Sequence, residues 1–361
     1  MKKITLTLLA FVFGAALFAQ TDLALVRFGK SYGFIDKKGT YIINPQFANA
    51  KSFSGGLARA RTATEWGYIN TKGTYAINPQ FENVEDFSEG LARVRKFKQW
   101  GYIDKTGTFV VNPQFDDAED FSDGIARVRK GMQWGLIDKK GTYVVNPQFD
   151  AIGVFVIGLA KARKGKQWGY IDKAGSWVIN PQFDEAEDFS NGLARVRKGF
   201  TWGFVDKAGT YVINPQFEAV GDFSGNLARA KKMRQWGYID KKGIWVINPQ
   251  FDDAKDFSEG LARVLKGRQW GFVDTKGTYS INPQFDDAGS FYDGIACVRK
   301  GMQWGYIDAK GTFVINPQFD DVMAFSNGMA LIRKGMKWGY IDKKGTIIIN
   351  MQFDSAENFS E

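Results

Sequence analysis

The sequence contains no histidine, and Cys297 is the only cysteine among its 361 residues. Without histidine, no Ser–His or Cys–His pair, imidazole general base or histidine-ligated metal site can form. A single cysteine also rules out a disulfide within the chain, although exported proteins often carry one. The folded state must therefore be held together by packing alone.

Long apolar runs are also scarce. The one such run is Ile4–Phe18, 15 residues long, which follows Lys2 and Lys3 and precedes Ala19. This is the pattern of a secretory signal peptide. A membrane anchor is the alternative, but the run is shorter than the roughly 20 residues that span a bilayer. We predict that residues 1–19 are a cleaved signal peptide. Residues 20–361 are then exported to the periplasm or out of the cell, with no remaining membrane span.

The formal charge is +9 and the pI is near 9.3, values that raise the possibility of nucleic-acid binding. The predicted export and the acidic residues interspersed along the chain argue against it, so we expect no nucleic-acid partner. The sequence is 44% apolar and 15% aromatic, which is ample for a packed core.

One motif recurs with a period of 34 residues and without insertion or deletion. Each copy has Gly after an aromatic residue, which is Tyr32 in the first copy and Trp in the other nine: Trp66, Trp100, Trp134, Trp168, Trp202, Trp236, Trp270, Trp304 and Trp338. Helical hairpin repeats can share this period. However, each unit also carries turn glycines, an Asn-Pro (Asn-Met in the last copy) and short Val-, Ile-, Tyr- and Phe-rich runs, which indicate strands and turns. The sequence therefore predicts an all-β protein.

The unit Leu91–Gly124 reads as a β-meander. We expect strands at 91–95, 100–104 and 108–112, the last buried on both faces and ended by Pro113. A tight turn at 104–107 should place Gly107 at positive φ. An irregular fourth segment, 115–121, should turn Phe115, Ala118 and Phe121 inward. Such a unit cannot bury itself and needs a copy on each side.

The stacking of the units is constrained by arginine. Arg93 and Arg127, like Arg95 and Arg129, occupy matching repeat positions. In a β-helix, matching positions would lie about 4.8 Å apart, and the stacked charges would repel. Two arrangements remain, an open curved array and a closed propeller-like ring. Propellers usually have about 4–8 blades, so we favour the open array of ten repeats. The integer number of repeats favours the ring.

These features resemble the WG (KWG) repeat of bacterial proteins. The resemblance rests on Trp-Gly-Tyr-Ile-Asp-Lys-Lys-Gly, the following Asn-Pro-Gln-Phe, and Phe-Ser-x-Gly-Leu-Ala. It covers about 340 residues and departs from the pattern at Tyr32 and Met351. The resemblance implies a β-rich repeat domain over residues 20–361 and no shared catalytic activity.

The repeated acidic cluster of Asp116, Asp117, Glu119 and Asp120 is the main candidate for chemistry. Paired carboxylates suggest glycoside hydrolysis or calcium binding, but the spacing is not that of a calcium loop. A cluster that is part of the repeat is better explained as a solvated loop pairing with neighbouring arginines. The repeated Trp residues can stack on sugars, but core packing explains them better, and Cys297 stands where other units have Arg. We expect no catalytic residues, metal or cofactor.

One unit breaks the pattern, with Ala151–Gly158 standing where other units have acids and Ser. There Val154, Val156 and Ile157 replace polar residues on either side of Phe155. If exposed, Val154, Phe155, Val156 and Ile157 form a patch for a partner; the alternative is that they repack and are buried.

Three functions remain open. The one we favour is a non-enzymatic, monomeric interaction scaffold of the cell envelope that binds an unknown protein or glycan. The others are a secreted glycan-binding or glycan-active protein that uses the repeat carboxylates and aromatics, and a purely structural spacer.

Overall fold

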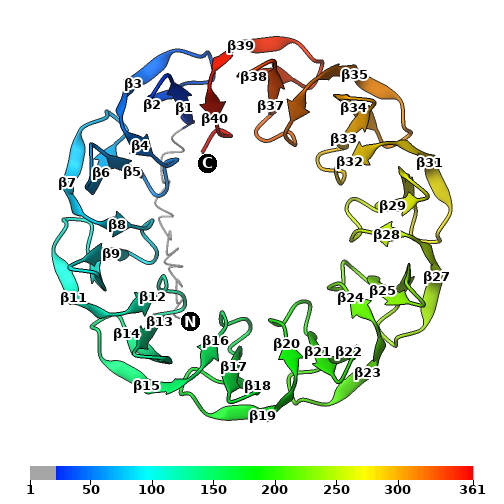
Figure 1. Cartoon of the computed structure of the whole chain (residues 1–361), viewed down its shortest axis with the longest axis horizontal. Coiled ribbons are helices and arrows are strands. Elements are labelled where there is room, and N and C mark those ends of the chain that lie inside the picture. Colours follow the sequence, from blue (N-terminus) through cyan, green and yellow to red (C-terminus); the bar gives the residue numbers. More distant parts are fainter. Residues whose placement is uncertain (1–21, 361) are drawn as a thin grey trace, which may run out of the picture.

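The computed structural model describes residues 22–360, so the predicted signal peptide lies outside the described residues. These residues form a closed ring of ten four-stranded antiparallel sheets, the blades of a β-propeller (Figure 1). Within this range there is no helix, and so none that could cross a membrane. The prediction of an all-β repeat protein is confirmed. The ring is the alternative arrangement; the favoured open array was wrong.

Each blade contains four kinds of strand. A two-residue first strand lies nearest the centre of the ring in Figure 1: β4 (Asn49–Ala50), β8 (Asn83–Val84), β12 (Asp117–Ala118), β16 (Ala151–Ile152), β20 (Glu185–Ala186), β24 (Ala219–Val220), β28 (Asp253–Ala254), β32 (Asp287–Ala288), β36 (Asp321–Val322) and β40 (Ser355–Ala356). The second strands are β1 (Ala24–Phe28), β5 (Leu57–Arg61), β9 (Ala92–Lys96), β13 (Ile125–Lys130), β17 (Ala160–Lys164), β21 (Ala194–Lys198), β25 (Ala228–Lys232), β29 (Ala262–Lys266), β33 (Ile295–Lys300) and β37 (Met329–Lys334).

The third strands carry the aromatic-Gly motif: β2 (Ser31–Ile35), β6 (Trp66–Asn70), β10 (Gln99–Ile103), β14 (Gln133–Asp138), β18 (Gln167–Ile171), β22 (Thr201–Val205), β26 (Gln235–Ile239), β30 (Gln269–Val273), β34 (Gln303–Asp308) and β38 (Lys337–Asp342). The fourth strands form the outer rim: β3 (Tyr41–Phe47), β7 (Tyr75–Phe81), β11 (Phe109–Phe115), β15 (Tyr143–Phe149), β19 (Trp177–Phe183), β23 (Tyr211–Phe217), β27 (Trp245–Phe251), β31 (Tyr279–Phe285), β35 (Phe313–Phe319) and β39 (Ile347–Phe353).

Blades are numbered 1 to 10 along the chain, beginning with the sheet of β1, β2 and β3. That first blade takes its innermost strand, β40, from the other end of the chain, because Val26 pairs with Ala356 and Arg27 with Ser355. Its interface with blade 10 repeats an internal contact: the Tyr340 hydroxyl donates to the Glu357 carbonyl at 2.7 Å, as Tyr102 does to Glu119 at 2.6 Å. The ring is therefore closed by the same contacts that join neighbouring blades elsewhere. This explains why the chain forms a ring and not an open array.

The core lies between blades. One of its clusters combines Tyr102, Val111 and Phe115 of blade 3 with Ala126 and Val128 of blade 4, all buried. The other nine clusters likewise draw on two neighbouring blades. The predicted inward positions of Phe115, Ala118 and Phe121 are confirmed, since all three are buried. Each blade is thus stabilised by its neighbours, as expected for a repeat protein.

The fourth strand differs from the prediction in two ways. β11 passes through Pro113 and ends at Phe115, because the missing N–H of proline is tolerated on an edge strand with an irregular register. Only Val111 of its apolar run is buried, while Val110 is 42% exposed on the rim. The irregular register between β10 and β11 brings the β11 backbone close to the glycine that follows Trp. A Cβ on Gly101 would lie 2.7 Å from the Pro113 nitrogen, which explains why this position is glycine.

The predicted positive φ of Gly107 is confirmed, at 87°. Gly124, which ends the unit, also has positive φ, of 80°. The Asp104 carboxylate accepts hydrogen bonds from the backbone N–H groups of Thr106 and Thr108, at 2.9 and 3.0 Å.

Candidate binding site at the divergent loop

The loops between first and second strands face the middle of the ring (Figure 1). We call them the inner loops; they carry the Phe-Ser-x-Gly motif and its variants. Neighbouring inner loops are joined by hydrogen bonds: the Ser88 hydroxyl donates to the Phe121 carbonyl, and the N–H groups of Asp123 and Gly124 donate to the Glu89 carboxylate. The inner loops therefore form a connected rim of nearly identical parts.

The acidic cluster is used for pairing between blades. Arg93 of blade 3 donates through Nη1 to the Ala118 carbonyl, and its Nε lies 2.8 Å from Asp120 in blade 4. Arg195 and Arg229 make the same kind of pair with Asp222 and Asp256, at 2.7 and 2.9 Å. Asp116 instead accepts the N–H of Gly131 at 2.6 Å. No cluster of His, Cys, Asp and Glu that could hold a metal is found within residues 22–360. The geometry therefore supports ion pairing for these carboxylates.

The repeated Trp residues are packed, but less deeply than expected. Trp100 is buried, while most of the others are half-buried against the clusters between blades. Arginines cover their rings: the guanidinium carbon of Arg93 lies 5.4 Å from the Trp100 ring centroid, and that of Arg129 lies 5.9 Å from Trp134. Faces covered in this way offer little stacking surface to a sugar.

The divergent loop is the inner loop of blade 5. Val154 and Ile157 are 47% and 49% exposed, whereas Phe155 and Val156 are half-buried against neighbouring clusters. The structure thus divides the predicted patch into two exposed and two packed side chains.

Ile157 has φ of 51°, in the left-handed region. The corresponding residues of other blades are Gly, Glu, Asp or Asn. A β-branched residue with positive φ is a genuine outlier, which holds about 1–3 kcal/mol of strain and is characteristic of functional sites.

Val154 also removes the usual carboxylate partner of Arg127 in blade 4. Arg127 donates to the Ile152 carbonyl at 2.7 Å, and its only described carboxylate contact is Glu119, at 3.9 Å. Leu136 stands where six other blades have a Tyr that donates across the interface. The interface between blades 4 and 5 therefore lacks the arginine–aspartate pair and the tyrosine hydrogen bond, two of the polar links that join blades 3 and 4. The interface between blades 8 and 9 has Ser290 and Phe272 at the same positions.

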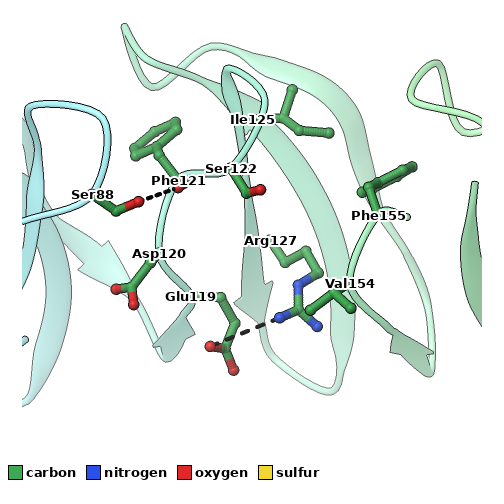
Figure 2. A pocket seen from close by; sticks show the side chains of 9 residues that line it. All are labelled: Ser88, Glu119, Asp120, Phe121, Ser122, Ile125, Arg127, Val154 and Phe155. Atoms are coloured by element: carbon green, nitrogen blue, oxygen red, sulfur yellow. Dashed lines mark hydrogen bonds and ion pairs between the residues drawn. The ribbon is translucent and has the colours of Figure 1, made fainter. Parts of the chain in front are cut away.

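A cavity of about 300 Å³ opens at this place. Figure 2 shows its lining side chains, with Arg127 directed toward Glu119: Ser88, Glu119, Asp120, Phe121, Ser122, Ile125, Arg127, Val154 and Phe155. They come from the inner loops of blades 3, 4 and 5 and from the start of β13. The cavity combines a cation, two carboxylates and an apolar wall, and it includes two residues of the predicted patch.

A second cavity, of about 440 Å³, lies between the inner loops of blades 7 and 8, beside Asn226 and Glu259. Asn226 stands where other blades have a turn glycine with positive φ, such as Gly124 and Gly260, but its own φ is not positive. Arg229 keeps its Asp256 partner at this interface, so no charged group has lost its usual contact.

Sequence reasoning identified the divergent loop but missed Arg127. A signal was present: Arg59, Arg93, Arg195 and Arg229 are each followed 27 residues later by Asp, whereas Arg127 is followed by Val154 and Arg263 by Ser290.

The repeats that form the ring match the model of a known protein family. The family model for the WG-containing repeat matches ten consecutive segments: residues 32–62, 66–96, 100–131, 134–168, 168–199, 202–232, 236–268, 270–301, 304–338 and 338–361. The chain belongs to the WG-containing repeat family. Its WG repeats are offset from the blades, because each matched segment begins on a third strand and seven of the ten end at or just after the second strand of the next blade.

Solved structures are similar to this chain to differing degrees, with little shared sequence. A eukaryotic initiation factor is similar at a TM-score of 0.50 and 11% identity, over 90% of this chain and 99% of that one. The dihydro-heme d1 dehydrogenase NirN in complex with DHE has a TM-score of 0.39 and 12% identity, over 94% and 75% of the two chains. BamB from Moraxella catarrhalis has a TM-score of 0.35 and 9% identity, over 92% and 94%. Among curated proteins, no sequence matches this chain.

Proposed function

We propose that this WG-repeat ring is a non-enzymatic interaction scaffold of the cell envelope, exported by its signal segment, and that it binds a protein partner at the inner loops of blades 4 and 5. The observation that carries the proposal is the divergent loop. In this loop the ion pair of the repeat is absent and Ile157 has a strained backbone conformation. The side chains of Val154 and Ile157 are nevertheless exposed. Elsewhere in the chain the Val154 position is most often Asp, and the Ile157 position is Gly, Glu, Asp or Asn, so the loop departs from the repeat at both.

The chemistry of the cavity narrows the class of partner. Arg127 lacks the carboxylate that Arg59, Arg93, Arg195 and Arg229 contact across their interfaces. Val154, Phe155 and Ile125 provide an apolar wall beside it. A segment with a carboxylate next to a bulky apolar side chain would complete both features. Arginine suits this role because its fork binds carboxylates in a bidentate manner.

The glycan alternative receives less support. A sugar site of the kind expected from the sequence needs accessible carboxylates and open aromatic faces. The carboxylates described above are paired with arginines or capping turns, and arginines or lysines lie over most of the Trp rings.

The test uses two matched arginine variants. Arg127→Met removes the cation of the proposed site, whereas Arg229→Met removes its counterpart at the interface between blades 7 and 8. Immobilised wild-type ring and both variants are exposed to envelope extract, and the retained proteins are compared. We expect a protein that wild type and Arg229→Met retain and Arg127→Met loses, and a short acidic-apolar peptide from it should compete. Equal retention by both variants would contradict the assignment of the site.

A further inference from the structure

A second surface lies at the opposite ends of the second strands. The turns that join second to third strands carry six Phe or Met side chains that are between 78% (Phe97) and 94% (Phe200) exposed: Phe97, Met132, Phe200, Met233, Met302 and Met336. We call these residues the turn tips. Single exposed apolar side chains are common on protein surfaces, but these six recur at the same turn of the blade and therefore form a regular set.

The ring places the tips on one circle. The turns occupy the same position in every blade, and the blades repeat around one axis (Figure 1). The tips belong to blades 3, 4, 6, 7, 9 and 10, so they are spread around the ring and form no single patch. A globular partner would reach only neighbouring tips, whereas a flat, extended surface would meet all six together.

Basic side chains accompany the tips. The ten four-residue turns contain fourteen Lys and Arg residues and a single acid, Glu65: Lys30, Lys96, Lys98, Lys130, Lys164, Lys166, Lys198, Lys232, Arg234, Lys266, Arg268, Lys300, Lys334 and Lys337. Nine further carboxylates lie beside the turns, and each accepts a backbone N–H of its turn, as Asp116 does from Gly131. Basic groups still outnumber acids at this face.

Two of the turn tips, Phe97 and Met233, have a strained backbone conformation. Seven turns place Gly at their first central position, with φ near 60°, whereas Phe97 and Met233 occupy that position with φ of 54° and 50°. Glycine would be the relaxed choice. The strain favours a role for the apolar side chains themselves.

We propose that this face docks onto an anionic phospholipid bilayer. The turn tips insert shallowly among the acyl chains, and the surrounding Lys and Arg side chains meet the lipid phosphates. Exposed apolar residues flanked by lysine are the combination that holds peripheral proteins at an anionic interface. A flat bilayer also matches the circular distribution of the tips.

The test uses the chain from Gln20 onward, which contains the whole ring and lacks the apolar segment 4–18. Sedimentation with phosphatidylglycerol vesicles is compared with phosphatidylcholine vesicles. The tip variant carries Met132→Ser, Phe200→Ser, Met302→Ser and Met336→Ser, all at positions more than 85% exposed. The control carries Val110→Ser, Val178→Ser, Val212→Ser and Val246→Ser, at rim positions that are 42% to 46% exposed.

We expect wild type and control to bind phosphatidylglycerol vesicles and not phosphatidylcholine vesicles. The tip variant should bind about tenfold more weakly or worse. Lys130→Gln, Lys198→Gln, Lys300→Gln and Lys334→Gln together should also weaken binding, and added salt should weaken it in wild type. The proposal is overturned if wild type does not bind at low salt, or if the tip variant binds as well as the control. It is also overturned if the tips instead hold two rings together, seen as a lipid-free dimer that the tip variant loses.

Discussion

The interface between blades 3 and 4 and the next one, between blades 4 and 5, have the same apolar core but different polar links. Gly141 packs on Val111 across the first, and Gly175 packs on Val145 across the second. The first also has the Arg93–Asp120 ion pair and the Tyr102 hydrogen bond. The second has Val154 and Leu136 at those positions. The difference shows that apolar packing specifies the ring, since an interface forms without these two polar links. The interface between blades 8 and 9, with Ser290 and Phe272 at the same positions, is a second example.

The shared core gives the largest expected effect. In Gly141→Val and Gly175→Val, a β-branched residue would be forced to positive φ with its Cβ less than 3 Å from a valine of the preceding blade. Each should lower the free energy of unfolding by about 3 kcal/mol. Urea unfolding of both variants checks this. A much milder effect at Gly175 would mean that the interface between blades 4 and 5 is loose throughout.

Replacing the arginine by Met should destabilise the ring more at the first interface than at the second. Arg93→Met breaks an ion pair and leaves the Ala118 carbonyl without its donor, so we expect a loss of about 2 kcal/mol. Arg127→Met removes a carbonyl contact and a distant carboxylate, so we expect about 1 kcal/mol or less. Melting curves of both variants and of the double variant test this. Glu119 lies 3.6 Å from Arg93 and 3.9 Å from Arg127, so a departure from additivity would measure this shared contact. Equal losses would show that Arg127 has a partner as strong as Asp120.

The strained residue should respond in the opposite direction to its regular counterpart. Ile157→Asn replaces a β-branched residue at positive φ with one that tolerates this region, and should stabilise the ring by about 1 kcal/mol. Asn191→Ile makes the reverse change in blade 6, where Asn191 has φ of 51° and donates to the Phe223 carbonyl at 2.6 Å. It should destabilise by at least as much. Destabilisation by Ile157→Asn would show that the isoleucine is needed for packing.

The smallest expected effect is on how the stability of the ring changes with pH. Partial burial acts to raise the pKa of Glu89, but the Lys139 ammonium and the N–H groups of Gly124 and Asp123 outweigh it and lower that pKa. A carboxyl with a lowered folded-state pKa adds stability above its unfolded pKa, and this is lost as pH falls through the folded value. Glu89→Gln should therefore be less stable than wild type by a few tenths of a kcal/mol at pH 7, since the group is near the surface.

The difference should vanish in acid, and melts across pH check this. Ile157 occupies the matching position in blade 5, so Ile157→Asn should show the same pH dependence as wild type. A Glu89→Gln difference that persists below the folded pKa would mean that the carboxylate charge is not the cause.

The sequence predicted what is local and repeated. Asp104 and Gly107 define their turn by backbone chemistry, and Phe115, Ala118 and Phe121 point inward because each unit must bury them. Ring closure was not predictable in this way, because it depends on β40 meeting β1 after nine small rotations between blades. The edge-strand position that admits Pro113 and exposes Val110 is also a property of the assembled ring.

The candidate site was half predictable. Val154 and Ile157 stand out from the repeat as single residues. The role of Arg127 appears only when a residue of one blade is paired with the loop of the next. The turn tips escaped notice because each Met or Phe is unremarkable within its own turn, and only the ring brings them onto one circle.

The central claim is that the divergent loop lowers the stability of the ring and provides the binding site for its partner. The variant Val154→Asp with Ile157→Asn restores the regular pattern, giving Arg127 its carboxylate and relieving the strained isoleucine. Its melting temperature and its capture of the partner from envelope extract are measured beside wild type. We predict a melting temperature higher by about 1–3 °C together with loss of capture. A lower melting temperature, or unchanged capture, would contradict the claim.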